Sequence, residues 1–148
     1  MINGGNMITK GLMSSNTNEW ATPQAFFDEL NKEFNFDLDP CATYENHKCN
    51  YYITKEQDGL KTSWKGHRVF CNPPYGSEIS KWVEKAYNEN KDNNTFIVML
   101  LPARTDTRWF HNWIYKKHEI RFIKGRLKFN DGPKAAPFPS MIIIMEVK

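Results

Sequence analysis

The chain has 148 residues, of which 40% are hydrophobic and 25% charged, and its formal net charge is +3 at pH 7. These values indicate one ordinary globular domain with one core. The charge is too small to establish a nucleic-acid partner by itself, and no apolar stretch approaches the roughly 20 residues that cross a bilayer, so no membrane span is expected.

Residues 1–18 are mostly small and polar, with many Gly, Asn and Ser residues. This composition predicts a flexible N-terminal segment, and it lacks the charged and apolar blocks of a secretory signal. We expect a single domain over residues 19–148. Its cysteines show no disulfide framework, which indicates reduced thiols and a cytoplasmic protein.

The domain is predicted to begin with a helix over residues 22–34, because apolar side chains recur there at helical spacing. Pro23 suits the first helical position and Thr22 the N-cap. Apolar residues then alternate up to Leu38, which predicts a strand that ends at Pro40, since proline cannot donate to a ladder.

The remaining elements follow in alternation. They are a short buried strand at 67–72, a helix at 77–91 capped by Ser77, a central strand at 94–103, a helix at 105–117, and strands at 118–125 and 140–147. This order implies an α/β sheet, in which ligands bind outside the carboxyl ends of the strands. The segments 39–42 and 72–75 both follow strands, so they should lie on the same rim.

The second of these segments is Asn72-Pro73-Pro74-Tyr75. It could be a plain turn, but its place between a strand and a helix, with Gly76 after it, favours a binding role. The prolines fix two φ angles, so the amide oxygen of Asn72 and the carbonyl of Pro73 can face one volume as acceptors. Beside them we expect the ring of Tyr75 to offer a flat face. Such a corner suits a planar group with an amine, whose nitrogen becomes a better nucleophile without a strong base.

Two neighbouring residues could bind a ligand at the same rim. Asp39 could accept hydrogen bonds from hydroxyl or amino groups, and Thr22 could meet a carboxylate at the start of the first helix. The alternatives are a turn cap for Asp39 and an ordinary N-cap for Thr22. A zinc site would draw on Cys41, His47, Cys49 and Cys71, but no C-x-x-C pair is present, so we expect no metal.

Several segments together carry a family resemblance. They are EWATP (19–23), FDLDPCA (36–42), FCNPPYG (70–76), LLPARTDTRWF (100–110), IRFIKGRLKF (120–129) and APFPS (136–140). In this order, from about Asn18 to the C-terminus, the chain resembles the small phage-type, Dam-like DNA N6-adenine methyltransferases. The resemblance implies a class I S-adenosylmethionine-dependent methyltransferase, with a Rossmann-like sheet, helices on both faces and a minimal single domain.

The resemblance also implies roles for individual residues. Asn72 and Pro73, with Pro74, would hold the amine of a flipped adenine while Tyr75 stacks on it, and the amine would attack the sulfonium methyl in line. Trp20, Thr22 and Pro23 match the segment that contacts the methionine part of the cofactor. Asp39, Pro40, Cys41 and Ala42 match the first cofactor motif, and Asp58 matches an acidic contact to the cofactor's adenine. Either Glu45 or Glu56 would contact the ribose of the cofactor. The phosphates of DNA could be bound by Arg104, Arg108, Arg126 and Lys128.

The implied partner is double-stranded DNA in the cytoplasm of a bacterial host, for a phage or prophage protein without a metal. Segment 39–46 lacks the glycine that often follows the first cofactor motif. No insertion is large enough for a separate recognition domain, so the target must be read by loops 102–108 and 125–139 or by a second copy in a homodimer. The alternatives are amino-methyltransferases acting on DNA cytosine, RNA adenine or protein glutamine, and a non-catalytic phage DNA-binding regulator.

Overall fold

A six-stranded sheet in the order β2-β1-β3-β4-β6-β5 forms the centre of the computed structural model, which describes residues 19–148. The flexible segment predicted for residues 1–18 lies outside the described residues. The strands are β1 (Leu38–Ala42), β2 (Tyr51–Thr54), β3 (Arg68–Cys71), β4 (Phe96–Pro102), β5 (Glu119–Phe122) and β6 (Ser140–Met145). The helices are α2 (Gln24–Phe34), α3 (Ile79–Asn93) and α4 (Arg108–Trp113), with a 3-10 turn at Phe129–Asp131.

The first four strands are parallel, whereas β6 runs antiparallel to both β4 and β5. From β1 the chain moves outward to β2, and from β3 it moves the other way to β4, so the topology switches between β1 and β3. Only one residue pair, Leu38 with Val69, is in register between these two strands. The sequence did not predict β2, because Ile53 is its only buried residue and an edge strand needs no apolar pattern.

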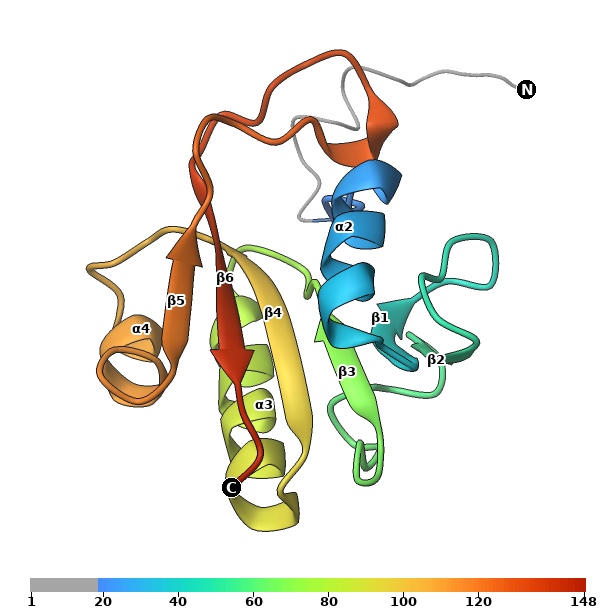
Figure 1. The fold of residues 1–148 in the computed structure, drawn as a ribbon, viewed down its shortest axis with the longest axis vertical. Coiled ribbons are helices and arrows are strands. Elements are labelled where there is room, and N and C mark those ends of the chain that lie inside the picture. The colour runs from blue at the N-terminus through green and yellow to red at the C-terminus, as the bar shows by residue number, and fades with distance from the viewer. Residues whose placement is uncertain (1–18) are drawn as a thin grey trace.

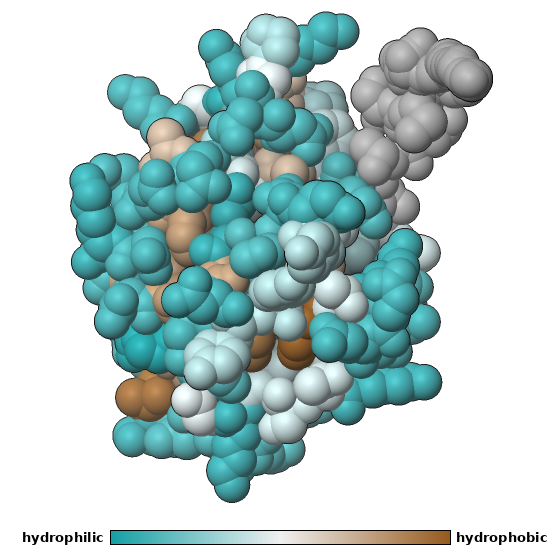
Figure 2. All heavy atoms as spheres, turned by 90° about the vertical axis from the view of Figure 1, so that its right-hand side faces the viewer, coloured by the Kyte–Doolittle hydropathy of each residue, from teal (hydrophilic) through white to brown (hydrophobic). Residues whose placement is uncertain are grey.

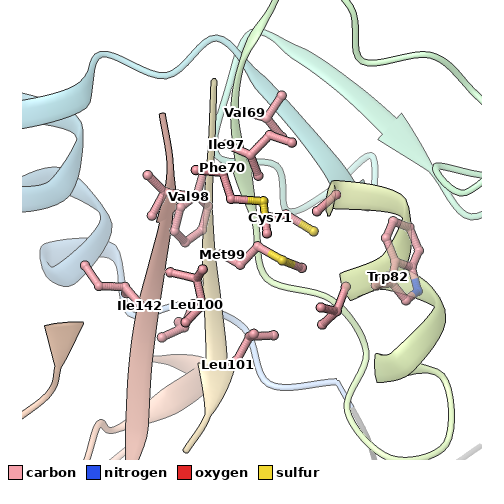
Figure 3. Packing of buried hydrophobic residues seen from close by; sticks show 14 of the residues in the cluster. Val69, Phe70, Cys71, Trp82, Ile97, Val98, Met99, Leu100, Leu101 and Ile142 are labelled. Carbon is pink, nitrogen blue, oxygen red and sulfur yellow. The ribbon is translucent and has the colours of Figure 1, made fainter. Parts of the chain in front are cut away.

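Helices cover both faces of the sheet, with α2 in front of β1 and β3 and α3 behind β4 (Figure 1). The faces follow the alternation of the strands (Figure 3). Phe70 meets Phe27 of α2, with ring centroids 5.2 Å apart, while Cys71 and Met99 point to the face on which Trp82 of α3 lies. All of β4 is buried, which confirms the prediction of a central strand covered on both sides.

Two predicted helix starts are wrong. Pro23 is the N-cap of α2 rather than its first residue, and its carbonyl accepts from Phe27 N at 3.0 Å. Thr22 therefore does not cap the helix, and its buried side chain bonds elsewhere. Ser77 does not cap α3 either, because the chain makes a further turn through Glu78 before the helix begins.

Two predicted boundaries are also wrong. Strand β1 does not stop at Pro40 but continues to Ala42, since a register shift after Asp39 accommodates a residue that cannot donate. The helix predicted over 105–117 is only α4, which Thr107 caps by accepting from Phe110 N. The chain then leaves the helix and adopts a left-handed φ of 63° at Lys116.

The surface over β1 and β2 is mainly hydrophilic, and apolar atoms show there only in small separate places (Figure 2). Scattered apolar side chains of this kind are ordinary on a protein surface. Within residues 19–148, no helix has the length and apolar character needed to cross a membrane.

Candidate active site

The carboxyl ends of the parallel strands meet at one edge of the sheet, as predicted. There the Sγ atoms of Cys41 and Cys71, on β1 and β3, lie 3.6 Å apart. The turn at Asn72–Tyr75 follows β3 directly, and the segment between β5 and β6 arches over the same edge beside the start of α2 (Figure 1). The two segments singled out in the sequence therefore share a rim at the switch point of the sheet.

The side-chain amide of Asn72 is held in one orientation. Its Nδ2 donates to the backbone carbonyl of Trp20 and to Oγ1 of Thr22, the latter at 3.0 Å. A backbone carbonyl can only accept, so Nδ2 must face Trp20 and Oδ1 must face the other way. Oδ1 is buried and has no hydrogen-bond partner within the described part of the chain. A buried acceptor left unpaired costs about 1–3 kcal/mol, which marks this position as one that suits a donor.

Tyr75 does not offer the open ring face that the sequence led us to expect. Its side chain is only 2% exposed, and its hydroxyl donates to the carbonyl of Leu100 at 3.1 Å. Phe129 and Phe138 approach the ring edge to face, with centroids 6.3 and 5.7 Å away. Burial raises the pKa of the phenol well above its usual value, so the hydroxyl stays protonated.

Three aromatic side chains, Trp20, Phe129 and Phe138, form a cover over the turn, which we call the aromatic cover. The Trp20 ring lies 5.7 Å from Phe129 and 5.2 Å from Phe138, again edge to face. Two hydrogen bonds between Ala21 and Asn130 hold the aromatic cover together. Ala21 N donates to Oδ1 of Asn130 at 2.9 Å, and Asn130 N donates to the Ala21 carbonyl at 2.8 Å. Sequence reasoning gave Phe129 and Phe138 no role, although both lie in segments that carried the family resemblance.

The loop that bears this cover is shaped by its own polar residues. Asn130 and Asp131 adopt left-handed φ angles of 62° and 52°, which Asn and Asp tolerate better than most residues. Oδ1 of Asp131 accepts from Gln24 N at 3.2 Å, at the start of α2. Arg126 Nη1 donates to the carbonyl of Ala136 at 3.2 Å and so joins the two arms of the loop.

Two surface hollows have volumes of about 260 and 290 Å³. The first is lined by Leu60, Lys81, Glu84, Lys85 and Asn88, and the second by Asn90, Lys117, His118, Glu119, Ile144, Glu146, Val147 and Lys148. Neither is lined by a residue of the Asn72–Tyr75 turn, which in this closed arrangement lies against the aromatic cover.

Asp39, the second residue of β1, braces the loop that follows the strand. Its Oδ1 accepts from Cys41 N at 3.1 Å and its Oδ2 from Lys48 N at 2.9 Å. Burial raises the pKa of this carboxyl, and the two backbone bonds oppose the shift. These contacts are those of a turn cap. Each carboxylate oxygen retains a second lone pair that a ligand could use.

Gly59 makes a close approach to β1 that the sequence did not reveal. A Cβ built on it would lie 2.3 Å from the Pro40 carbonyl oxygen and 2.8 Å from the Trp82 ring. Asp58, the neighbour of Gly59, has a φ of 62° and accepts from Leu60 N at 3.0 Å, so its carboxylate shapes this turn.

The other predicted cofactor residues occupy varied positions. Burial holds the pKa of the Cys41 thiol well above its usual value, and its sulfur contacts that of Cys71. Ala42 is buried at the end of β1, whereas Glu45 and Glu56 are exposed just after β1 and β2. Within residues 19–148, no group of three or more His, Cys, Asp or Glu side chains is placed to hold a metal.

The predicted DNA contacts lie on segments that flank the same edge. Arg104 and Arg108 follow β4, Arg126 and Lys128 lie on the loop of the aromatic cover, and all four are exposed. None of the four forms an ion pair with another described residue. The same loop exposes two further lysines that sequence reasoning had passed over, Lys124 and Lys134.

The mixed α/β sheet and the Asn-Pro-Pro-Tyr turn at its carboxyl edge have the layout expected of a methyltransferase, and the comparisons with known proteins assign the chain to that class of enzyme. A family model described as DNA N-6-adenine-methyltransferase (Dam) matches residues 10–147. The chain belongs to this family, whose members are adenine-specific DNA methyltransferases.

Two phage proteins illustrate the relationship, and both are named DNA N-6-adenine-methyltransferase. The protein of Haemophilus phage HP1 is 32% identical over 151 residues, which cover 96% of this chain and 87% of the relative. The protein of Escherichia phage T1 is 36% identical over 110 residues, which cover 73% of this chain but only 45% of the relative. The resemblance found in the sequence is therefore confirmed.

Proposed function

We propose that this protein transfers a methyl group from S-adenosylmethionine to the exocyclic amine of adenine in double-stranded DNA, in the cytoplasm of a bacterial host. Membership of the family supports the substrate and the reaction. The observation that carries the mechanism is the buried, unpartnered Oδ1 of Asn72. An amine supplies the donor that this oxygen lacks, and adenine presents its amine on a flat ring.

In this mechanism the turn holds the amine and strengthens it as a nucleophile. Oδ1 of Asn72 and the carbonyl of Pro73 each accept one N–H of the amine, which draws its lone pair out of conjugation with the purine. Both acceptors are neutral, so the amine is oriented without being deprotonated first. The new N–C bond would form as the bond between the methyl carbon and the sulfonium sulfur breaks, which would leave S-adenosylhomocysteine, and the surplus proton of the amine would pass to solvent. Pro74 keeps the corner rigid through its fixed φ.

The position of the switch point fits S-adenosylmethionine, which supplies an electrophilic methyl group when it is bound. Ligands of α/β sheets collect where the strand order reverses, and here β1 and β3 separate after a single pair in register. On the β1 side, Asp39 and the turn at Asp58 would hold the cofactor. Glu45 or Glu56, which follow the carboxyl ends of β1 and β2, would hold the ribose. With these roles the sheet is a reduced class I methyltransferase fold.

The stacking role of Tyr75 requires the aromatic cover to open. Phe129 and Phe138 pack edge to face with its ring in the closed arrangement, and Tyr75 is buried. Lys128 and Arg126 lie on the same loop, so phosphate contacts made by these residues act directly on the segment that must move. A base flipped out of the duplex would then take the place of the cover and stack on Tyr75.

The test is an assay with labelled S-adenosylmethionine and four acceptors: duplex DNA with all four bases, RNA, a DNA duplex of G·C pairs only, and a glutamine-containing protein. We expect label only in the duplex that contains adenine, and N6-methyladenine after digestion to nucleosides. Label in cytosine, in RNA or in protein would show that this acceptor, and not adenine in DNA, is the substrate. Duplex binding without any transfer would instead indicate a non-catalytic regulator. Asn72→Ala is the matched control, because it removes the acceptor Oδ1 and leaves Asp39 and Asp58 in place.

A further inference from the structure

The bonds around Asn72 assign a task to Thr22 that differs from the cofactor contact implied by the family resemblance. The side chain of Thr22 is only 3% exposed, and its Oγ1 accepts from Nδ2 of Asn72 at 3.0 Å. The Trp20 carbonyl accepts from the same nitrogen. Both N–H groups of the Asn72 amide are thus engaged by one short segment that lies 50 residues or more away in the sequence.

This segment is itself held in place. Between Trp20 and Thr22, the backbone N–H and carbonyl of Ala21 are both bonded to Asn130. Directly after Thr22, Pro23 begins α2 as its N-cap. Since both ends are anchored, the two acceptors keep fixed positions relative to the amide of Asn72.

We infer that Thr22 is a positioning residue that, together with the Trp20 carbonyl, holds the Asn72 amide with Oδ1 outward. The inference rests on the proposed function, in which Oδ1 must face the substrate amine. A flipped amide would present Nδ2, which has no lone pair to offer, so that donor would face donor. The Trp20 carbonyl can only accept, so it opposes the flipped amide, and Oγ1 of Thr22 engages the second N–H of Nδ2. The orientation with Oδ1 outward therefore leaves neither N–H unpaired.

The test compares Thr22→Val, which keeps the shape but removes the acceptor, with Thr22→Ser, which keeps the hydroxyl. We expect Thr22→Val to lower kcat about tenfold while the KM for S-adenosylmethionine changes less than about twofold. Thr22→Ser should stay within about threefold of the wild type. Thr22→Val should also lose most of the preference for binding a duplex with adenine over one with purine, which lacks the amine, at the target position.

A purely structural role would weaken binding of the two duplexes equally, so an unchanged preference for adenine would overturn the inference. It would also fall if Thr22→Val raised the KM for S-adenosylmethionine at constant kcat, since Thr22 would then be a cofactor contact. If Thr22→Val does not fold, the same measurements are made on Thr22→Ala, which also lacks the hydroxyl. A wild-type protein that leaves adenine unmethylated overturns the proposed function, whereas an active wild type with a fully active Thr22→Val variant overturns only this inference.

Discussion

Replacing Gly59 by alanine tests whether the approach of its segment to β1 is as tight as the structure describes. The new Cβ would lie 2.3 Å from the Pro40 oxygen, roughly 1 Å inside the separation at which such atoms normally meet. The indole of Trp82 lies 2.8 Å away on another side. Pro40 belongs to β1 and Trp82 is buried, so neither neighbour can withdraw easily.

The expected cost is that of overpacking a rigid site, about 1–3 kcal/mol, and two fixed neighbours place Gly59→Ala near the upper end. For a chain of this length each kcal/mol lowers Tm by roughly 2–4 °C, so the melting temperature should fall by roughly 6–12 °C. Asp58 forms the same turn, so the affinity for S-adenosylmethionine should fall as well.

Urea unfolding followed by tryptophan fluorescence measures the free energy of unfolding, and calorimetric titration measures cofactor affinity. Gly132→Ala is the matched control, because its Cβ would meet only the Phe129 oxygen, at 3.6 Å, and its φ is −92°. We expect this control to stay within about 0.5 kcal/mol of the wild type. Gly66→Ala should cost about 1 kcal/mol through its φ of 84° alone. A Gly59→Ala variant as stable as the control would refute the close approach.

Four further predictions concern the site and the pH dependence. Asn72→Ala should lower kcat about 10²- to 10³-fold with unchanged cofactor affinity, measured by single-turnover assay and calorimetry; equal turnover would exclude the amine-binding role. Tyr75→Ala should weaken binding of a duplex with a flipped base by roughly 1–3 kcal/mol. Tyr75→Phe loses only the hydrogen bond to Leu100 and should bind this duplex normally. Equal binding by the two variants would reject the stacking role. Asn130→Ala removes the side-chain hydrogen bond to Ala21 N that holds the aromatic cover, so limited proteolysis should cut the 126–139 loop faster. An unchanged rate would show that other contacts hold the cover. Burial lowers the pKa of His118, so the neutral form is favoured in the folded state and stability should fall as pH drops below about 6.5. Urea unfolding between about pH 7.5 and 5.5 measures this fall, and His118→Gln should reduce it. An identical fall in both proteins would exclude His118 as its source.

Local patterns in the sequence determined much of this protein. The continuous apolar run of β4 predicted a central strand because a strand covered on both faces needs no polar positions. The helical spacing of Ile79, Trp82 and Val83 predicted α3, and all three are buried in it. The place of Asn72-Pro73-Pro74-Tyr75 after a strand predicted its position on the rim, since parallel strands end at one edge.

The tertiary structure alone decided how the rim is built. Thr22 and Asn72 are 50 residues apart, and Ala21 and Asn130 are 109 apart, so no periodicity within a window relates them. The burial of Tyr75 depends on Phe129 and Phe138, which reach it from the far end of the chain. Residue types and their local spacing set each element, but the partner of a polar atom or ring is chosen by the packing of elements distant in sequence. For that reason the sequence named the residues of the turn, whereas the bonds that orient Asn72 emerged only from the folded chain.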